Sequence, residues 1–160
     1  MSKIRDKVKN KKALRRTVIV PASEEDARTL GEAREEYTRA VIQGGGPAAR
    51  GKLKAIEDEV AERGFAVTFR GIGRPAFEAL RRTHQPTAEQ KAESSMAMFN
   101  VDTFPAALCA ASEDDSSPMT EQEWLAQVFQ SSEFNTGELG AIFNAAQSAQ
   151  TDSQVVELGN

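Results

Sequence analysis

The sequence predicts an α+β fold that is mostly α, in which two short strands flank a helical hairpin and a bundle of about five short helices follows. Alanine and glutamate are abundant while aromatic residues make up 6% of the 160 residues, which favours helices packed through aliphatic and Phe side chains. Two short segments have the β-branched or alternating pattern of strands. Glycine, proline and capping residues divide the remainder into segments with helical spacing.

The first strand is predicted at 17–20, where the β-branched run Thr-Val-Ile-Val stops at a proline. A helix should follow, because Ser23 and the three acidic residues after it resemble a capped helix start. Apolar residues at helical spacing extend this helix to about Gln43.

The second half of the hairpin begins after three glycines at 44–46, which end the preceding helix. Pro47 suits the first position of a new helix, whose apolar residues follow a 4-3-4 pattern up to Gly64. Alternating Phe and Val at 65–70 then predict a second strand with one face inward. We expect the two strands to pair into a small sheet that the hairpin covers.

The five later helices are predicted from their start signals, which are prolines or capping residues. The expected starts are Pro75, Thr87, Asp102 or Thr103, Thr120 and Asn135. The helix after Thr87 should reach about Met98, and the polar sequence from Gln147 should fray. Together these patterns predict a flexible arm at 1–16, one α-rich domain at 17–150 and a disordered tail at 151–160.

The net charge of −4 conceals an asymmetry along the chain. Residues 1–16 hold eight basic residues against the single Asp6, a charge of +7, so the remaining residues carry −11. Such an arm suits a negative partner, namely nucleic acid, an acidic protein or the body of a neighbouring copy; a solvated leader is the structural alternative. The candidate contact residues of this basic arm are Lys7, Lys11, Lys12, Arg15 and Arg16.

Rare residues and motifs provide no support for catalysis, so we predict no enzyme, no cofactor and no metal site. One cysteine, Cys109, and one histidine, His84, supply neither a disulfide nor a four-ligand zinc site. The phosphate-loop frame at 46–52 lacks the Ser or Thr that follows its lysine, and the Gly-x-Gly-x-x-Ala of 71–76 lacks a following βαβ unit. The acids at 113–115 lack calcium-loop spacing and read as a solvated loop.

The apolar segments are short. None approaches the ~18 consecutive apolar residues of a membrane-spanning helix. The run at 18–22 is also shorter than the ~7–15 residues of an export signal. We therefore expect a protein that stays in the cytoplasm and does not enter a membrane.

The amphipathic helices near the C-terminus are expected to form mostly core. A small domain of short helices often leaves one groove that accepts a partner helix, however. The candidate partner-binding residues are Trp124, Phe129, Leu139 and Phe143.

Several stretches of the chain resemble the tail assembly chaperones of long-tailed, siphovirus-type bacteriophages of actinobacteria. They are residues 65–80, 84–87, 99–108 and 119–124, and the likeness covers roughly 17–150. The stretches contain packing and capping patterns and no catalytic signature. The chain departs from the resemblance in having Phe77 where we expect Trp, and in its long basic arm.

The resemblance implies a non-enzymatic protein that binds the tape-measure protein, keeps it soluble and helps to recruit tail tube proteins in the host cell cytoplasm. It also implies a longer form made by programmed ribosomal frameshifting, and leaves self-association open. The alternative is a nucleic-acid-associated or virion adaptor protein that uses the basic arm. Nucleic acid is the less expected partner, because the arm has no aromatic residue on which bases could stack.

Overall fold

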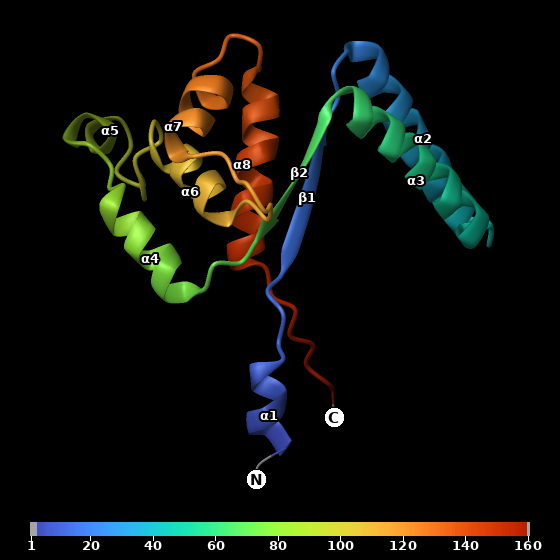
Figure 1. Ribbon diagram of the computed structural model, residues 1–160, viewed down its shortest axis with the longest axis horizontal. Helices are drawn as coiled ribbons and strands as arrows, with labels where there is room; N and C mark the ends of the chain where they lie inside the picture. Colours follow the sequence, from blue (N-terminus) through green and yellow to red (C-terminus); the bar gives the residue numbers. More distant parts are fainter. Residues whose placement is uncertain (1–2, 160) are drawn as a thin grey trace. The chain divides into compact units, whose positions relative to one another are not determined.

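The computed structural model of the chain describes residues 3–159 (Figure 1). The chain is 60% helical with two short antiparallel strands, which confirms the predicted α+β, mostly α, class. It divides into two compact units, which we call the hairpin unit (Thr17–Val67) and the helical unit (described residues 3–16 and 68–159). The predicted division into an arm, one domain and a tail stays a prediction.

The elements follow one another with short connections. In chain order they are α1 (Lys3–Lys9), β1 (Arg15–Val20), α2 (Glu24–Ile42), α3 (Gly46–Arg63), β2 (Phe65–Arg70), α4 (Arg74–Thr83), α5 (Ala88–Glu93), α6 (Phe104–Ser112), α7 (Glu121–Trp124), the π-helical turn η1 (Leu125–Phe129) and α8 (Thr136–Thr151). No helix among the described residues is long and apolar enough to cross a bilayer.

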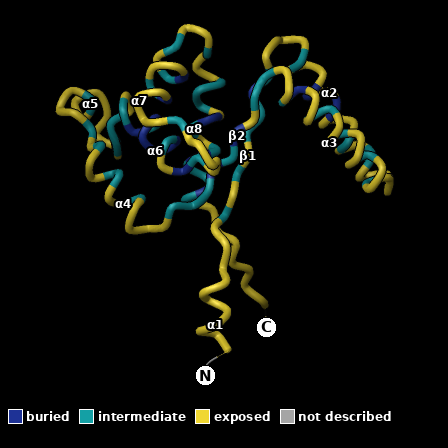
Figure 2. Tube along the Cα trace, viewed as in Figure 1, coloured by how far each residue is buried: buried dark blue, intermediate teal, exposed yellow. Residues whose placement is uncertain are grey.

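The hairpin unit consists of α2 and α3 lying side by side, with parts of both strands at one end (Figure 1). Its buried side chains gather at that end and are few. They are Val20, Leu30, Ala33, Val60 and Val67. Most of the length of the two helices is therefore exposed or half-buried, as the yellow and teal tube of Figure 2 shows.

An ion pair joins the two helices at the strand end of the hairpin. Arg63 in α3 donates from Nε and Nη2 to the carboxylate of Asp26 in α2, with the shortest distance 2.7 Å. The hydrogen bond from Arg63 holds the pKa of Asp26 below its usual value. Ser23 caps α2 by accepting from the Asp26 N–H at 3.1 Å, which confirms the predicted helix start.

The helical unit is built around α6. This helix contacts α4, α7, η1 and α8, and six of its nine residues are buried. Small side chains let its neighbours approach closely, since three of the buried residues are Ala106, Ala107 and Cys109. Figure 2 shows the buried part of this unit concentrated on α6 and on the faces of α7 and α8 that contact it.

Two predicted helix ends are wrong. The helix after Thr87 stops at Glu93 instead of Met98, because Ser94 adopts an extended conformation. The helix predicted to fray from Gln147 continues to Thr151. There Gln150 donates to the Arg70 carbonyl and accepts from the Ile72 N–H, so a tertiary contact holds the last turn.

The basic arm contains regular structure. Residues Lys3–Lys9 form α1, and the first strand begins at Arg15, two residues before its predicted start. Both Ile4 and Val8 are exposed, so α1 buries no apolar face.

We expect Gly64→Ala to destabilise the protein strongly. Gly64 joins α3 to β2, and a Cβ there would collide with the Val20 carbonyl oxygen and lie 2.9 Å from the Ala22 nitrogen. Backbone cannot move aside cheaply, so we expect a loss of about 2 kcal/mol or more in urea unfolding.

The matched control is Gly31→Ala in the exposed middle of α2, where a Cβ meets nothing within 4 Å. This substitution should raise the free energy of unfolding by about 0.5–1 kcal/mol, since alanine is the better helix former. Equal effects of the two substitutions would contradict the role of Gly64.

Candidate partner-binding groove

An apolar groove lies on the helical unit between α8, η1 and the segment that leads into α6. It encloses about 660 Å³. Aromatic and aliphatic side chains form most of its wall, and Asp102, Gln130 and Thr136 are its polar groups. Its other lining residues are Phe99, Val101, Pro105, Leu125, Phe129, Leu139, Gly140 and Phe143.

A cluster of phenylalanines supports the groove. Phe104, in the first turn of α6, is completely buried. The ring of Phe99 lies 4.7 Å from that of Phe104 and 5.5 Å from that of Phe143, the latter edge to face. Such offset and edge-on contacts are the favoured geometries of aromatic pairs, so the wall of the groove is fixed by packing.

The π-helical turn η1 divides the apolar stripe of its segment between core and groove. Its defining hydrogen bond joins Gln130 N to the Leu125 carbonyl at 2.8 Å, one residue further back than in an α-helix. Val128 is buried, whereas Leu125 and Phe129 are half-buried and line the groove. Turns of this kind frequently occur at functional sites.

Capping boxes fix the two helices that border η1. Thr120 and Glu123 form one at the start of α7, and Asn135 and Glu138 form the other at the start of α8, which confirms the two predicted helix starts. At the start of each helix that borders the groove, side chains therefore accept hydrogen bonds from the N-cap and N3 backbone N–H groups.

Hydrogen bonds hold the segment before α6 in place. Asn100 donates its N–H to the His84 carbonyl at 2.7 Å and accepts from the Asp102 N–H. The His84 ring nitrogen Nδ1 lies 2.9 Å from the Thr103 hydroxyl. These contacts present Val101, which is 58% exposed, at the edge of the groove.

Three of the four predicted partner-binding residues, Phe129, Leu139 and Phe143, come together as lining of the groove. Trp124 lies elsewhere. It is 1% exposed and packs between Phe69 and Phe129, with ring centroids at 5.9 and 6.4 Å. Trp124 thus supports Phe129 from within the core instead of facing a partner.

Sequence reasoning missed Phe99, Val101 and Pro105 as lining residues. They lie in or next to a loop and follow no helical period, so a search for amphipathic stripes does not find them. Their only signal is that they fall within the stretch 99–108 that carries the family resemblance.

Glu113 is the most perturbed carboxylate near the core of the helical unit. Burial raises its pKa, although its hydrogen bond from the Met119 N–H at 3.0 Å opposes the shift. Asp115 and Glu123 raise the pKa further. The buried indole Nε1 of Trp124 lowers it slightly from nearby, but no described residue forms a hydrogen bond of ordinary geometry with this nitrogen.

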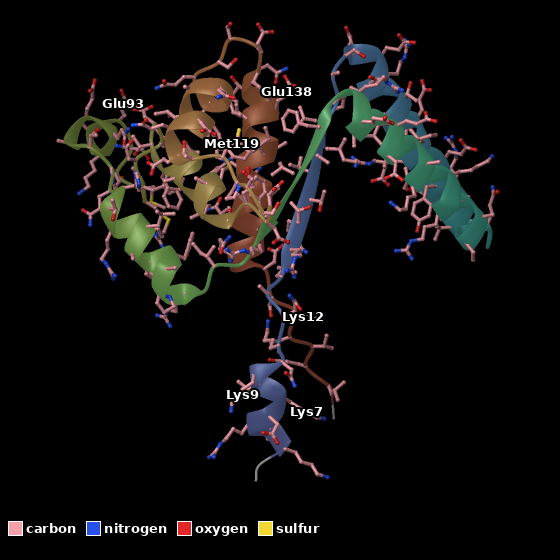
Figure 3. The ribbon with its side chains drawn as sticks, viewed as in Figure 1. Lys7, Lys9, Lys12, Glu93, Met119 and Glu138 are labelled. Carbon is pink, nitrogen blue, oxygen red and sulfur yellow. The ribbon has the colours of Figure 1, made fainter. Side chains whose placement is uncertain are left out.

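The predicted basic-arm residues divide into two groups. Arg15 pairs with Asp114 at 2.7 Å and Arg16 with Asp152 at 3.1 Å, so both arginines already have carboxylate partners within the helical unit. Lys7, Lys11 and Lys12 are exposed and form no ion pair with a described residue. Figure 3 shows Lys7 on α1 and Lys12 shortly after it, with their side chains extended.

Residues 3–159 contain no cluster of three or more metal-ligating side chains. The acids at 113–115 serve other contacts, since Asp114 pairs with Arg15 and Asp115 accepts from the Ser117 N–H. Cys109 is buried on α6, and burial raises the pKa of its thiol. The Gly-x-x-x-x-Gly-Lys pattern at 46–52 lies within α3, so this segment is helical and does not form a phosphate-binding loop.

Comparisons of the chain with protein-family models, curated proteins and solved structures yield no match. The resemblance to tail assembly chaperones stays a prediction.

Glu113→Gln should change how stability depends on pH. The folded protein holds the Glu113 proton more tightly than the unfolded chain, so stability from this group is present below its usual pKa of 4.5 and is lost as pH rises. The free energy of unfolding of the native protein relative to Glu113→Gln should therefore fall as the pH rises above the usual pKa of 4.5.

Asp26→Asn provides the control of opposite sign. The pKa of Asp26 is lowered, so its stabilisation is present above the usual value of 3.8 and is lost as pH falls. Urea unfolding over a pH series measures both differences. If the difference in free energy of unfolding between the native protein and Glu113→Gln stayed constant or rose with pH, the burial of the Glu113 carboxylate would be contradicted.

Proposed function

We propose that the protein is a phage tail assembly chaperone that binds apolar helical segments of the tape-measure protein in the groove. It keeps this partner soluble while tail tube proteins are recruited. The single observation that carries the proposal is the convergence of Phe129, Leu139 and Phe143 on one apolar groove. The tape-measure protein is proposed as the partner because four sequence stretches resemble this family.

The groove has the chemistry that an amphipathic helix requires. Helix-in-groove recognition places apolar side chains at i, i+3, i+4 and i+7 into a hydrophobic channel. Phe129 and Leu139 provide walls of this kind, and Val101 extends the apolar surface outward. The exposed Met96 and Met98 lie a few residues before Val101 and add flexible side chains that can adapt to different helices.

A long helical partner offers many similar segments. Weak binding by many copies then protects the whole partner, because each bound copy covers one apolar stripe. Each bound copy adds a net charge of −4, so a coated partner would have a negative surface, which opposes aggregation. A protein that binds many similar segments of one partner should not require a unique sequence. A shallow apolar groove suits such binding better than a deep polar pocket does.

The proposal also includes two further points: the protein acts in the host cell cytoplasm, and a longer form of it is made by ribosomal frameshifting. The coding DNA tests the frameshift directly: a slippery run with an overlapping reading frame near the codons of 158–160 should be present. A coding sequence without either would remove that part of the proposal and leave the groove untouched.

Val101→Asp should weaken binding of the tape-measure protein by about tenfold or more, because it places an unpaired charge at the apolar groove. The substituted side chain is already 58% exposed, so the fold should be unaffected. Co-expression with the neighbouring tape-measure protein, followed by solubility and pull-down measurements, provides the test.

Val156→Asp is the matched control, since Val156 is 79% exposed and lies outside the groove. It should leave solubility and capture of the partner unchanged. If the native protein neither solubilises nor captures the tape-measure protein, the proposal fails.

The alternative function, a nucleic-acid-associated or virion adaptor, is favoured by one observation: Lys7, Lys11 and Lys12 are exposed without ionic partners among the described residues. If they contact phosphates, replacing all three by Gln should weaken a salt-sensitive shift of DNA and reduce the salt slope by about one per lysine. Arg16→Gln is the control, because Arg16 pairs with Asp152. The chaperone proposal expects little or no DNA shift from the native protein.

A further inference from the structure

The charges of α3 are segregated along its length. Its first half carries Arg50, Lys52 and Lys54 and no acid, whereas residues 57–63 carry four acids and Arg63. This order opposes the helix dipole, which favours acids near the N-terminus and bases near the C-terminus. The helix dipole therefore does not explain the arrangement, and the ion pair Lys54–Asp58 accounts for only one base and one acid of α3.

The same helix borders an open apolar hollow on the hairpin unit. This hollow encloses about 550 Å³ between α2 and α3. Its larger apolar side chains are Tyr37, Leu53 and Ile56, and its charged ones are Glu36 and Lys52. None of the residues from 34 to 59 is buried, and Val41 and Ile42 are 47% and 81% exposed. Two helices alone cannot cover their apolar stripes, so this face lacks a partner within its own unit.

Lys52 and Glu59 lie seven residues apart, so they share one side of α3 with Ala55 and Ile56 between them. Lys52, Ala55 and Ile56 line the hollow. Neither Lys52 nor Glu59 forms an ion pair with a described residue. By contrast, Lys54 pairs with Asp58 at 3.1 Å and lines a different hollow of the hairpin unit.

We propose that this face of the hairpin binds the same face of a second copy of the chain. The two α3 helices run antiparallel about a two-fold axis near Ala55 and Ile56. Lys52 of each copy then lies opposite Glu59 of the other, because residues equidistant from the axis exchange places in an isologous interface. Two Lys52–Glu59 pairs therefore flank the axis, and the apolar hollow is covered.

Charge complementarity selects the second copy as occupant. An antiparallel copy sets Lys52 opposite Glu59 at two symmetric positions, whereas a parallel copy sets Lys52 beside Lys52 and Glu59 beside Glu59. The inference concerns the hairpin unit alone and holds whether or not the groove on the helical unit binds a tape-measure protein.

A charge swap tests the interface. Each of Lys52→Glu and Glu59→Lys places like charges across the axis at two symmetric positions, so each should raise the dimer dissociation constant about tenfold or more. The double variant K52E/E59K restores opposite charges and should dimerise as the native chain does. Sedimentation equilibrium of the full-length protein measures the constants.

Lys54→Glu is the matched control, since it makes the same charge change on the other side of α3 and should leave the dissociation constant unchanged. Helical circular dichroism of every variant verifies folding, and added salt should weaken the native dimer. A native chain that stays monomeric at its highest attainable concentration overturns the proposal. A dimer that is insensitive to both single swaps, or not restored by the double swap, also overturns it.

Discussion

The complete burial of Phe104 is the constraint on which the helical unit depends. Its ring lies within 6.2 Å, centroid to centroid, of Phe77 from α4, Phe99 from the preceding loop and Phe143 from α8. One side chain therefore fixes three separate segments around the start of α6. With eight Phe and one Trp in the chain, few other centres could do this. The groove is a product of the same packing, since Phe99 and Phe143 present their outer surfaces there.

Sequence patterns predicted correctly those elements whose formation depends on residues close together in the chain. The strand β2 has its predicted bounds, and the capping boxes at Thr87, Thr120 and Asn135 start their helices as expected. The ends of α5 and α8 were predicted less well. The last turn of α8 holds because Gln150 bonds to backbone near residue 71, a contact between residues about 80 positions apart that no local pattern contains.

The candidate site could be predicted only in part for a related reason. Helical period identifies which residues of one helix share a face, and Phe129, Leu139 and Phe143, which were chosen on that basis, line one groove; that they bind a partner stays a prediction. The helical period does not show how deeply a side chain is buried. Trp124 was therefore assigned to the partner surface although it is buried. The charge segregation of α3 was visible in the sequence, but its meaning required knowing which residues of the hairpin remain uncovered.

The π-helical turn has a consequence for how this surface could diversify. The width between η1 and α8 is set by a backbone register, in which Gln130 bonds to the Leu125 carbonyl, as much as by side-chain size. Losing one residue within that turn would restore an α-helical register and rotate Phe129 relative to α8. Binding preference could thus change through chain length alone, with every aromatic residue of the groove retained.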